Sequence, residues 1–206
     1  MGKIPENYLP PKETWPVYLT PDEFADIPHQ LNLADFLLDR HVREGRGENP
    51  AIKFMDKTIT YGQLQQMVNR FGNALKAVGV EPQDRVGIRL VNSPQALVTI
   101  FAIEKIGAVP VPTSPLWSAE EVGFVANNAE MKFFVVNAPL MEPVTKAKPE
   151  FEYGTRIIVI GGNPNEVKAA GDLVYEEMVE KGSPDLEATM LNADDIGIML
   201  YTSGTT

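Results

Sequence analysis

The last five residues of the chain combine hydroxyl side chains with a glycine: Thr202, Ser203, Gly204, Thr205 and Thr206. Hydroxyl groups and consecutive backbone amides donate hydrogen bonds, and a glycine lets the backbone approach an anion closely. The apolar run over residues 196–201 that leads into them is typical of a buried strand. Because ligands bind at the carboxyl ends of strands in open α/β sheets, the pattern predicts a nucleotide phosphate loop. The same residue types also occur in ordinary Ser/Thr/Gly turns. The residues alone therefore leave two interpretations open, a phosphate loop and a turn.

The chain offers few other groups for catalysis or metal binding. It has no cysteine, which excludes disulfides, thiolate metal sites and a thiol nucleophile. Its two histidines, His29 and His41, have charged or proline neighbours, so we expect solvated or capping roles. An acidic stretch with Glu176, Glu177 and Glu180 is typical of a solvated helix rather than of a cation site. We therefore expect no catalytic nucleophile or base and no metal ligand in this chain.

The composition restricts the class of protein. The 206 residues carry 18 Lys and Arg against 28 Asp and Glu, a net charge of −10, and 44% of them are hydrophobic. This balance argues against nucleic-acid binding, which depends on basic side chains that displace counterions. The longest uncharged stretches, residues 90–103 and 106–119, are shorter than the roughly 20 apolar residues of a membrane helix. Residues 1–16 lack the apolar run of a signal peptide, so we expect a cytoplasmic protein with no membrane span.

Capping signals mark the helices that would position the terminal loop. Thr60 followed by Gln63 has the form of a capping box and predicts a helix over residues 61–78. Ser93 before Pro94 predicts a helix that reaches residue 106, and Ser118 starts another that reaches residue 128. A further helix is predicted over residues 31–42, where four residues recur at helical spacing: Leu33, Phe36, Leu37 and His41.

Short apolar runs between these helices predict strands. Residues 51–55 and 58–61 form an expected hairpin, and further strands are expected over residues 85–91, 108–112, 132–136, 156–160 and 196–201. Two prolines confine the run 108–112 to an edge or a strand end. The alternation indicates an α/β fold with a mostly parallel sheet flanked by helices. Six prolines predict that residues 1–28 form an extended arm, which leaves residues 29–206 as the α/β unit.

Four segments occur in a particular order along the chain: Thr60–Leu64 (TYGQL), Gly79–Val86 (GVEPQDRV), Ile106–Pro112 (IGAVPVP) and Tyr201–Thr206 (YTSGTT). They resemble the TYxEL, GVxPGDRV, KAGAVxVP and phosphate-loop motifs of the adenylate-forming superfamily. That superfamily includes acyl- and aryl-CoA synthetases, luciferases and peptide-synthetase adenylation domains. Residues 31–47 and the early segment LPPKETWP are most similar to its benzoate and 2-aminobenzoate CoA ligase branch.

The resemblance implies the first subdomain of a large N-terminal adenylation domain and a two-step reaction. A carboxylate substrate attacks the α-phosphorus of ATP to give an acyl-adenylate and pyrophosphate, and coenzyme A then displaces AMP to form a thioester. ATP, Mg²⁺ and coenzyme A are the implied cofactors. The hydroxyls of Thr202, Ser203, Thr205 and Thr206 would donate hydrogen bonds to the β- and γ-phosphates, and Gly204 would give backbone access. None of these residues would act as a nucleophile.

The sequence also departs from the family pattern. The family's loop continues through Gly-x-Pro-Lys-Gly, whereas this sequence ends at Thr206 and lacks the family's later segments. We therefore expect the isolated chain to be inactive and to self-associate through a surface that the second subdomain covers in relatives. Two alternatives remain open, a non-catalytic module that binds nucleotide or a partner, and a dinucleotide-binding domain. The second lacks the G-x-G-x-x-G fingerprint, because Gly161, Gly162 and Asn163 fit a cap or turn.

Overall fold

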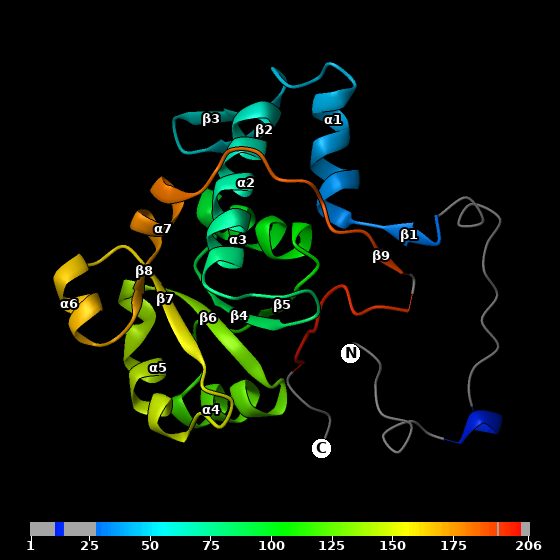
Figure 1. Cartoon of the computed structure of the whole chain (residues 1–206). Helices are drawn as coiled ribbons and strands as arrows, with labels where there is room; N and C mark the ends of the chain where they lie inside the picture. Colours follow the sequence, from blue (N-terminus) through cyan, green and yellow to red (C-terminus); the bar gives the residue numbers. More distant parts are fainter. Residues whose placement is uncertain (1–10, 15–27, 193, 203–206) are drawn as a thin grey trace.

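The computed structural model describes residues 11–14, 28–192 and 194–202. Within these ranges, five parallel strands form one sheet in the order β5-β4-β6-β7-β8 (Figure 1). The strands are β4 (Arg85–Arg89), β5 (Val109–Pro112), β6 (Met131–Asn137), β7 (Arg156–Ile160) and β8 (Leu173–Val174). The predicted α/β class is confirmed, and β5 lies at an edge of the sheet, as its two prolines require.

Helices cover both faces of the sheet (Figure 1). On β6, Phe133 and Val135 contact one hydrophobic cluster, whereas Phe134 and Val136 contact another. The first cluster includes side chains of α2, α3 and α7, and the second includes side chains of α4 and α5. This alternation is the two-residue period of a strand that is buried on both faces. The helices are α2 (Tyr61–Ala77), α3 (Pro94–Lys105), α4 (Ala119–Asn128), α5 (Met141–Ala147), α6 (Pro164–Ala169) and α7 (Tyr175–Lys181).

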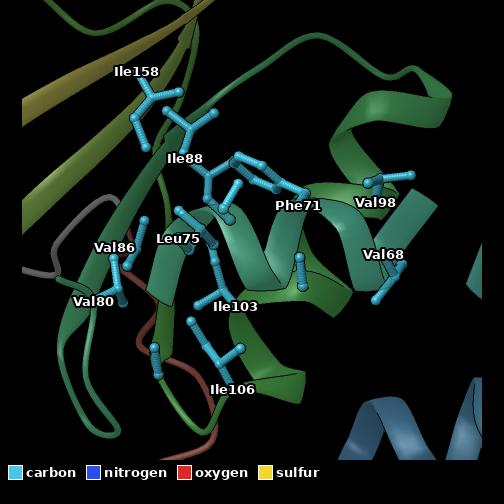
Figure 2. Packing of buried hydrophobic residues seen from close by; sticks show 14 of the residues in the cluster. Val68, Phe71, Leu75, Val80, Val86, Ile88, Val98, Ile103, Ile106 and Ile158 are labelled. Carbon is cyan, nitrogen blue, oxygen red and sulfur yellow. The ribbon is translucent and has the colours of Figure 1, made fainter. Parts of the chain in front are cut away.

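The larger cluster lies between the sheet and the α2–α3 pair, as Figure 2 shows. Phe71 and Leu75 of α2 and Ile103 of α3 are fully buried, and Ile88 of β4 is 5% exposed. The Phe71 ring lies 4.6 Å from the Tyr175 ring of α7, measured between centroids. Full burial of a side chain of this size contributes about 1.5–3 kcal/mol, so these contacts fix both helices on β4.

The predicted N-caps determine where the main helices begin. The Thr60 hydroxyl accepts a hydrogen bond from the Gln63 amide, and the Thr60 amide donates to the Gln63 side chain. Ser118 and Glu121 form the same reciprocal pair at the start of α4. Ser93 accepts from the amide of Ala96, with a proline in the first turn of α3. These caps satisfy amides that have no partner inside the helix, which is why the predicted starts are confirmed.

The first helix buries a different side from the one predicted. It contains a π-helical turn (Asp35–Asp39) followed by α1 (Arg40–Arg43). Ala34 and Leu38 are fully buried, whereas three residues of the predicted stripe are 37–46% exposed: Leu33, Phe36 and Leu37. Hydrogen bonds in a π turn run from residue i to i+5, which shifts the buried side relative to a regular α-helix. The spacing of apolar residues did not signal this turn.

Two short antiparallel pairs lie beside the main sheet. β2 (Pro50–Phe54) and β3 (Lys57–Thr60) form the predicted hairpin, and β1 (Gln30–Leu31) pairs with β9 (Leu191–Asn192) (Figure 1). Short 3₁₀ turns occur at Lys12–Thr14, Ala138–Leu140 and Lys148–Glu150. Most of the predicted arm lies outside the described residues, so its extended form and the boundary at residue 28 stay predictions. No helix in the described part of the chain is long and apolar enough to cross a membrane.

Candidate phosphate-binding site

Residues 196–201, which lead to the predicted loop, do not form the predicted strand. The Met199 amide donates to the Pro110 carbonyl of β5 over 3.1 Å. Because the amides of Val109 and Thr113 donate toward β4, the outward-facing positions of β5 are 110 and 112, and both are prolines. Proline has no N–H, so this edge cannot donate to a neighbouring strand. The prediction of a strand was wrong because it did not consider that the neighbouring edge lacks backbone N–H donors.

Gln83 supplies the hydrogen bonds that hold the start of this segment. Its side-chain carbonyl accepts from the Ile196 amide, and its side-chain amide donates to the Ile196 carbonyl, each over 3.2 Å. Gln83 is 8% exposed and has a φ of +66°, a region that favours glycine. The resembling motif GVxPGDRV has glycine at this position, so the two hydrogen bonds offset a backbone strain of about 1–2 kcal/mol. This role of Gln83 was not predicted from the sequence.

Tyr201 fixes the chain immediately before the predicted loop. Its hydroxyl donates to the side-chain oxygen of Asn128 at the end of α4, over 2.6 Å. Its ring lies with Trp117 against a small hydrophobic cluster that includes Val125 of α4. Burial raises the pKa of Tyr201, so the hydroxyl stays a neutral donor. These contacts place Thr202, which is exposed, beside the first turns of α4.

Of the five predicted site residues, Thr202 alone lies within the described part of the chain. It borders a cavity of about 340 Å³ together with Trp117 and Phe124. The other four lie outside the described residues: Ser203, Gly204, Thr205 and Thr206. The phosphate loop therefore stays a prediction. The exposed hydroxyl of Thr202 beside a cavity is suited to donate a hydrogen bond to a phosphate oxygen.

Two carboxylates line the same cavity and set its charge. Glu120 and Glu121 both belong to the first turn of α4. Hydrogen bonds from Ser118 hold the pKa of Glu121 below its ordinary value, so that carboxylate is ionised at neutral pH. Ionised carboxylates repel a triphosphate unless a cation neutralises them. In the part of the chain that the structure describes, no group of three or more His, Asp or Glu side chains is arranged to hold a metal ion.

Arg89 positions the loop that carries Trp117, a second role that was not predicted from the sequence. Arg89 ends β4 and is 1% exposed. Its guanidinium donates to the carbonyls of Ser114 (2.5 Å), Pro115 (2.9 Å) and Trp117 (2.9 Å). Burial lowers the pKa of Arg89, but the intrinsic value is so high that the group keeps its charge. The available signal was an arginine inside the otherwise uncharged run of residues 86–90 (VGIRL).

The other groups considered have structural roles. The Gly161 amide donates to the Glu176 carboxylate over 2.9 Å, and Asn163 caps α6, so this segment is the expected turn. His41 is half-buried rather than solvated: its ring stacks on Tyr61 at 4.4 Å between centroids, and its Nδ1 accepts from the Arg46 side chain. His29 is exposed, as expected.

Known proteins resemble this chain in both sequence and fold. The 3-hydroxybenzoate–CoA/4-hydroxybenzoate–CoA ligase of Thauera aromatica is 28% identical over 176 residues, which is 85% of this chain and 33% of that protein. An acetyl-coenzyme A synthetase of Methanothrix thermoacetophila is 31% identical over 194 residues, 86% of this chain and 29% of that protein. The crystal structure of the anthranilate CoA ligase AuaEII in complex with anthranoyl-AMP has a TM-score of 0.81 at 27% identity and covers 88% of this chain and 34% of that one.

This chain thus spans about one third of the length of the relatives that it matches. A family model described as "AMP-binding enzyme" matches residues 38–206, from the π-helical turn to the last residue. The match includes all five strands of the main sheet and the hydroxyl-rich end. The chain belongs to the AMP-binding enzyme family.

Proposed function

We propose that this chain is the N-terminal part of an ATP-dependent, AMP-forming carboxylate–CoA ligase. The observation that carries the proposal is the family match over residues 38–206, which ends within the hydroxyl-rich segment. In the proposed first step, a carboxylate oxygen attacks the α-phosphorus of ATP, a C–O–P linkage forms and pyrophosphate leaves. In the second, the thiol of coenzyme A attacks the acyl carbon, loses its proton and displaces AMP.

The chain's contribution to this reaction is to hold phosphate. Charge builds on pyrophosphate as it leaves, and donors fixed before the reaction stabilise that charge. The Thr202 hydroxyl, held by the anchored Tyr201, is one such donor, and the proposal assigns the same role to Ser203, Thr205 and Thr206, with Gly204 giving backbone access. ATP and coenzyme A are the co-substrates, and Mg²⁺ would neutralise the triphosphate beside Glu120 and Glu121.

We propose an aromatic acid of the benzoate class as the carboxylate. Support comes from the names of the relatives, which include the hydroxybenzoate–CoA ligase of Thauera aromatica and the anthranilate CoA ligase. Acetyl-coenzyme A synthetases match at similar identity, so acetate is the natural competitor. The cysteine-free sequence fits a reducing compartment such as the cytoplasm.

Exchange of labelled pyrophosphate into ATP tests the adenylation step. We expect the 206-residue chain alone to show no exchange above the enzyme-free blank with benzoate, 3-hydroxybenzoate or acetate, because it spans about one third of the length of the relatives that it matches. A chimaera in which this chain replaces the matching third of the Thauera aromatica ligase should regain exchange with an aromatic acid. Exchange in the chimaera should fall when Thr202→Val removes the hydroxyl, whereas the exposed control Thr58→Val should leave it unchanged. Full exchange with Thr202→Val would contradict the phosphate role.

A second candidate function is a non-catalytic module that binds nucleotide or a partner. It is favoured by one observation, that helices bury both faces of the main sheet within this chain. Saturable binding of ATP to the isolated chain in calorimetry, without exchange activity, supports the module over the ligase part. Three exposed apolar side chains on the final segment support the expected self-association: Met190, Ile198 and Leu200. Sedimentation equilibrium measures that association directly.

A further inference from the structure

A second cavity is lined by residues of the β1–β9 pair and of the end of α3. Its volume is about 260 Å³, and apolar side chains form much of its lining, including Leu31, Leu33 and Leu191. Asn32 fixes the cavity's wall, because its side-chain amide donates to the carbonyls of Glu104 (2.7 Å) and Thr189 (2.8 Å). The described lining residues of this cavity and of the one beside Thr202 do not overlap.

Glu104 brings a carboxylate into this apolar cavity. The residue is 8% exposed, and no described residue gives its carboxylate a hydrogen bond or an ion pair. Its neighbour Lys105 points elsewhere and pairs with Asp39. Burial raises the pKa of Glu104 to about 7 from an ordinary value of 4.5. A carboxylate that burial has partly removed from water favours a ligand that supplies a cation.

The other charges around the cavity also favour a cation. Asp195 lines it and accepts a hydrogen bond from the Asn192 amide over 2.8 Å, and no lysine or arginine is among the described lining residues. His29, on the chain before β1, is the other titratable group among the described lining residues. In addition, Glu104 lies in the last turn of α3, where the helix dipole is negative. An anionic ligand would meet two carboxylates and a negative helix end.

We propose that this cavity binds a small primary amine with an apolar tail, whose ammonium group pairs with the Glu104 carboxylate while its tail lies against Leu31, Leu33 and Leu191. The ammonium donates to the carboxylate oxygens and gains a charge-assisted hydrogen bond in a site of low dielectric constant. None of the described residues that line this cavity borders the cavity beside Thr202, so this proposal does not depend on the proposed function.

Titration of the 206-residue chain with 2-phenylethylamine, followed by backbone amide NMR shifts at pH 8, tests the proposal. We expect saturable shifts around the cavity with a Kd of about 1 mM or below. Glu104→Gln keeps the shape but removes the charge, and should weaken binding at least tenfold. Gly197→Leu should fill the cavity, which Gly197 lines and where a Cβ would lie 4.0 Å from Leu33, and should abolish binding. The matched control Glu187→Gln, at an exposed glutamate, should bind as the unaltered chain does.

Two further measurements test whether the cavity recognises the positive charge of the ligand. Lowering the pH from 8 to 6 protonates Glu104, so amine affinity should fall by about tenfold, and it should still do so in a His29→Gln variant. The isosteric anion 3-phenylpropanoate should not bind at pH 8. Absence of saturable shifts with the amine, equal binding of the anion, or unchanged affinity in both Glu104→Gln and Gly197→Leu would each overturn the proposal.

Discussion

The Lys105 ammonium lies 2.7 Å from a carboxylate oxygen of Asp39, and the two side chains are 1% and 7% exposed. The ammonium also donates to the Asn69 side chain (2.5 Å), and Asp39 accepts from Gln65 (2.8 Å). The pair therefore ties α3 to the π-helical turn and to α2. Its surrounding hydrogen bonds satisfy the charges, which is the condition under which a buried ion pair is tolerated.

Lys105→Met should lower the free energy of unfolding by about 3 kcal/mol, because it leaves the Asp39 carboxylate buried without its cation. The double variant Asp39→Leu, Lys105→Met should recover most of that loss, since no charge then remains buried. Urea denaturation measures both. Lys146→Met, which breaks the exposed pair with Glu142, is the control and should cost less than about 1 kcal/mol. A double variant no more stable than Lys105→Met alone would contradict this account.

Arg89→Met should cost about 3 kcal/mol or more, because it leaves three loop carbonyls without their donor. The loop should also loosen around Trp117. The fluorescence of Trp117, measured in a Trp15→Phe background so that it is the only tryptophan, should therefore shift to longer wavelength. Arg89→Lys should not rescue either property, because an ammonium cannot reproduce the planar array of donors. The exposed Arg43→Met serves as control. Unchanged emission from Trp117 would show that Arg89 does not position the loop.

The raised pKa of Glu104 should make stability depend on pH. The pKa is about 7 in the folded chain and 4.5 in the reference state, so the folded chain binds the proton more tightly. The contribution of Glu104 to the free energy of unfolding should therefore be greatest below pH 4.5 and should be lost as the pH rises through 7. The loss should be about 2 kcal/mol after allowance for partial solvent screening. Urea denaturation at several pH values, compared with Glu104→Gln, measures this. An identical pH profile for the two proteins would contradict the raised pKa.

Gly182→Ala should destabilise the contact between α7 and α2. A Cβ at Gly182 would lie 2.0 Å from the Arg70 carbonyl oxygen, and the backbone of α2 cannot move without disturbing the core. We expect a loss of about 2 kcal/mol or more in thermal or urea unfolding. Gly123→Ala in α4 is the matched control, because its Cβ would find only ordinary contacts at 3.7 Å and should stabilise the helix by up to about 1 kcal/mol. Equal effects at the two positions would argue against this close approach.

The sequence predicted those parts of the fold that local chemistry determines. The Thr60 and Ser118 caps depend on side chains within three residues of the helix start, so short sequence patterns locate them. The edge position of β5 follows in the same way from the missing donors of Pro110 and Pro112.

Features that depend on distant partners were not predictable. The π-helical turn exposes Phe36, and the apolar spacing looks the same with or without it. Residues 196–201 have the composition of a strand, but their partner edge lacks donors. Arg89 and Gln83 act on segments more than 20 residues away, through hydrogen bonds that no local pattern encodes. At the candidate site, the sequence shows Thr202 after an apolar run but does not reveal its neighbours on α4, and its role in a phosphate loop stays a prediction.

The outward prolines of β5 also govern how the chain behaves toward other molecules. An exposed sheet edge normally serves as a template on which a foreign strand can add and seed aggregation. Here the edge can accept hydrogen bonds, as Pro110 does from Met199, but it can donate none at its two outward positions. The missing N–H groups of the two prolines therefore disfavour the addition of a strand from another molecule at this edge, even when residues 196–201 move away from β5.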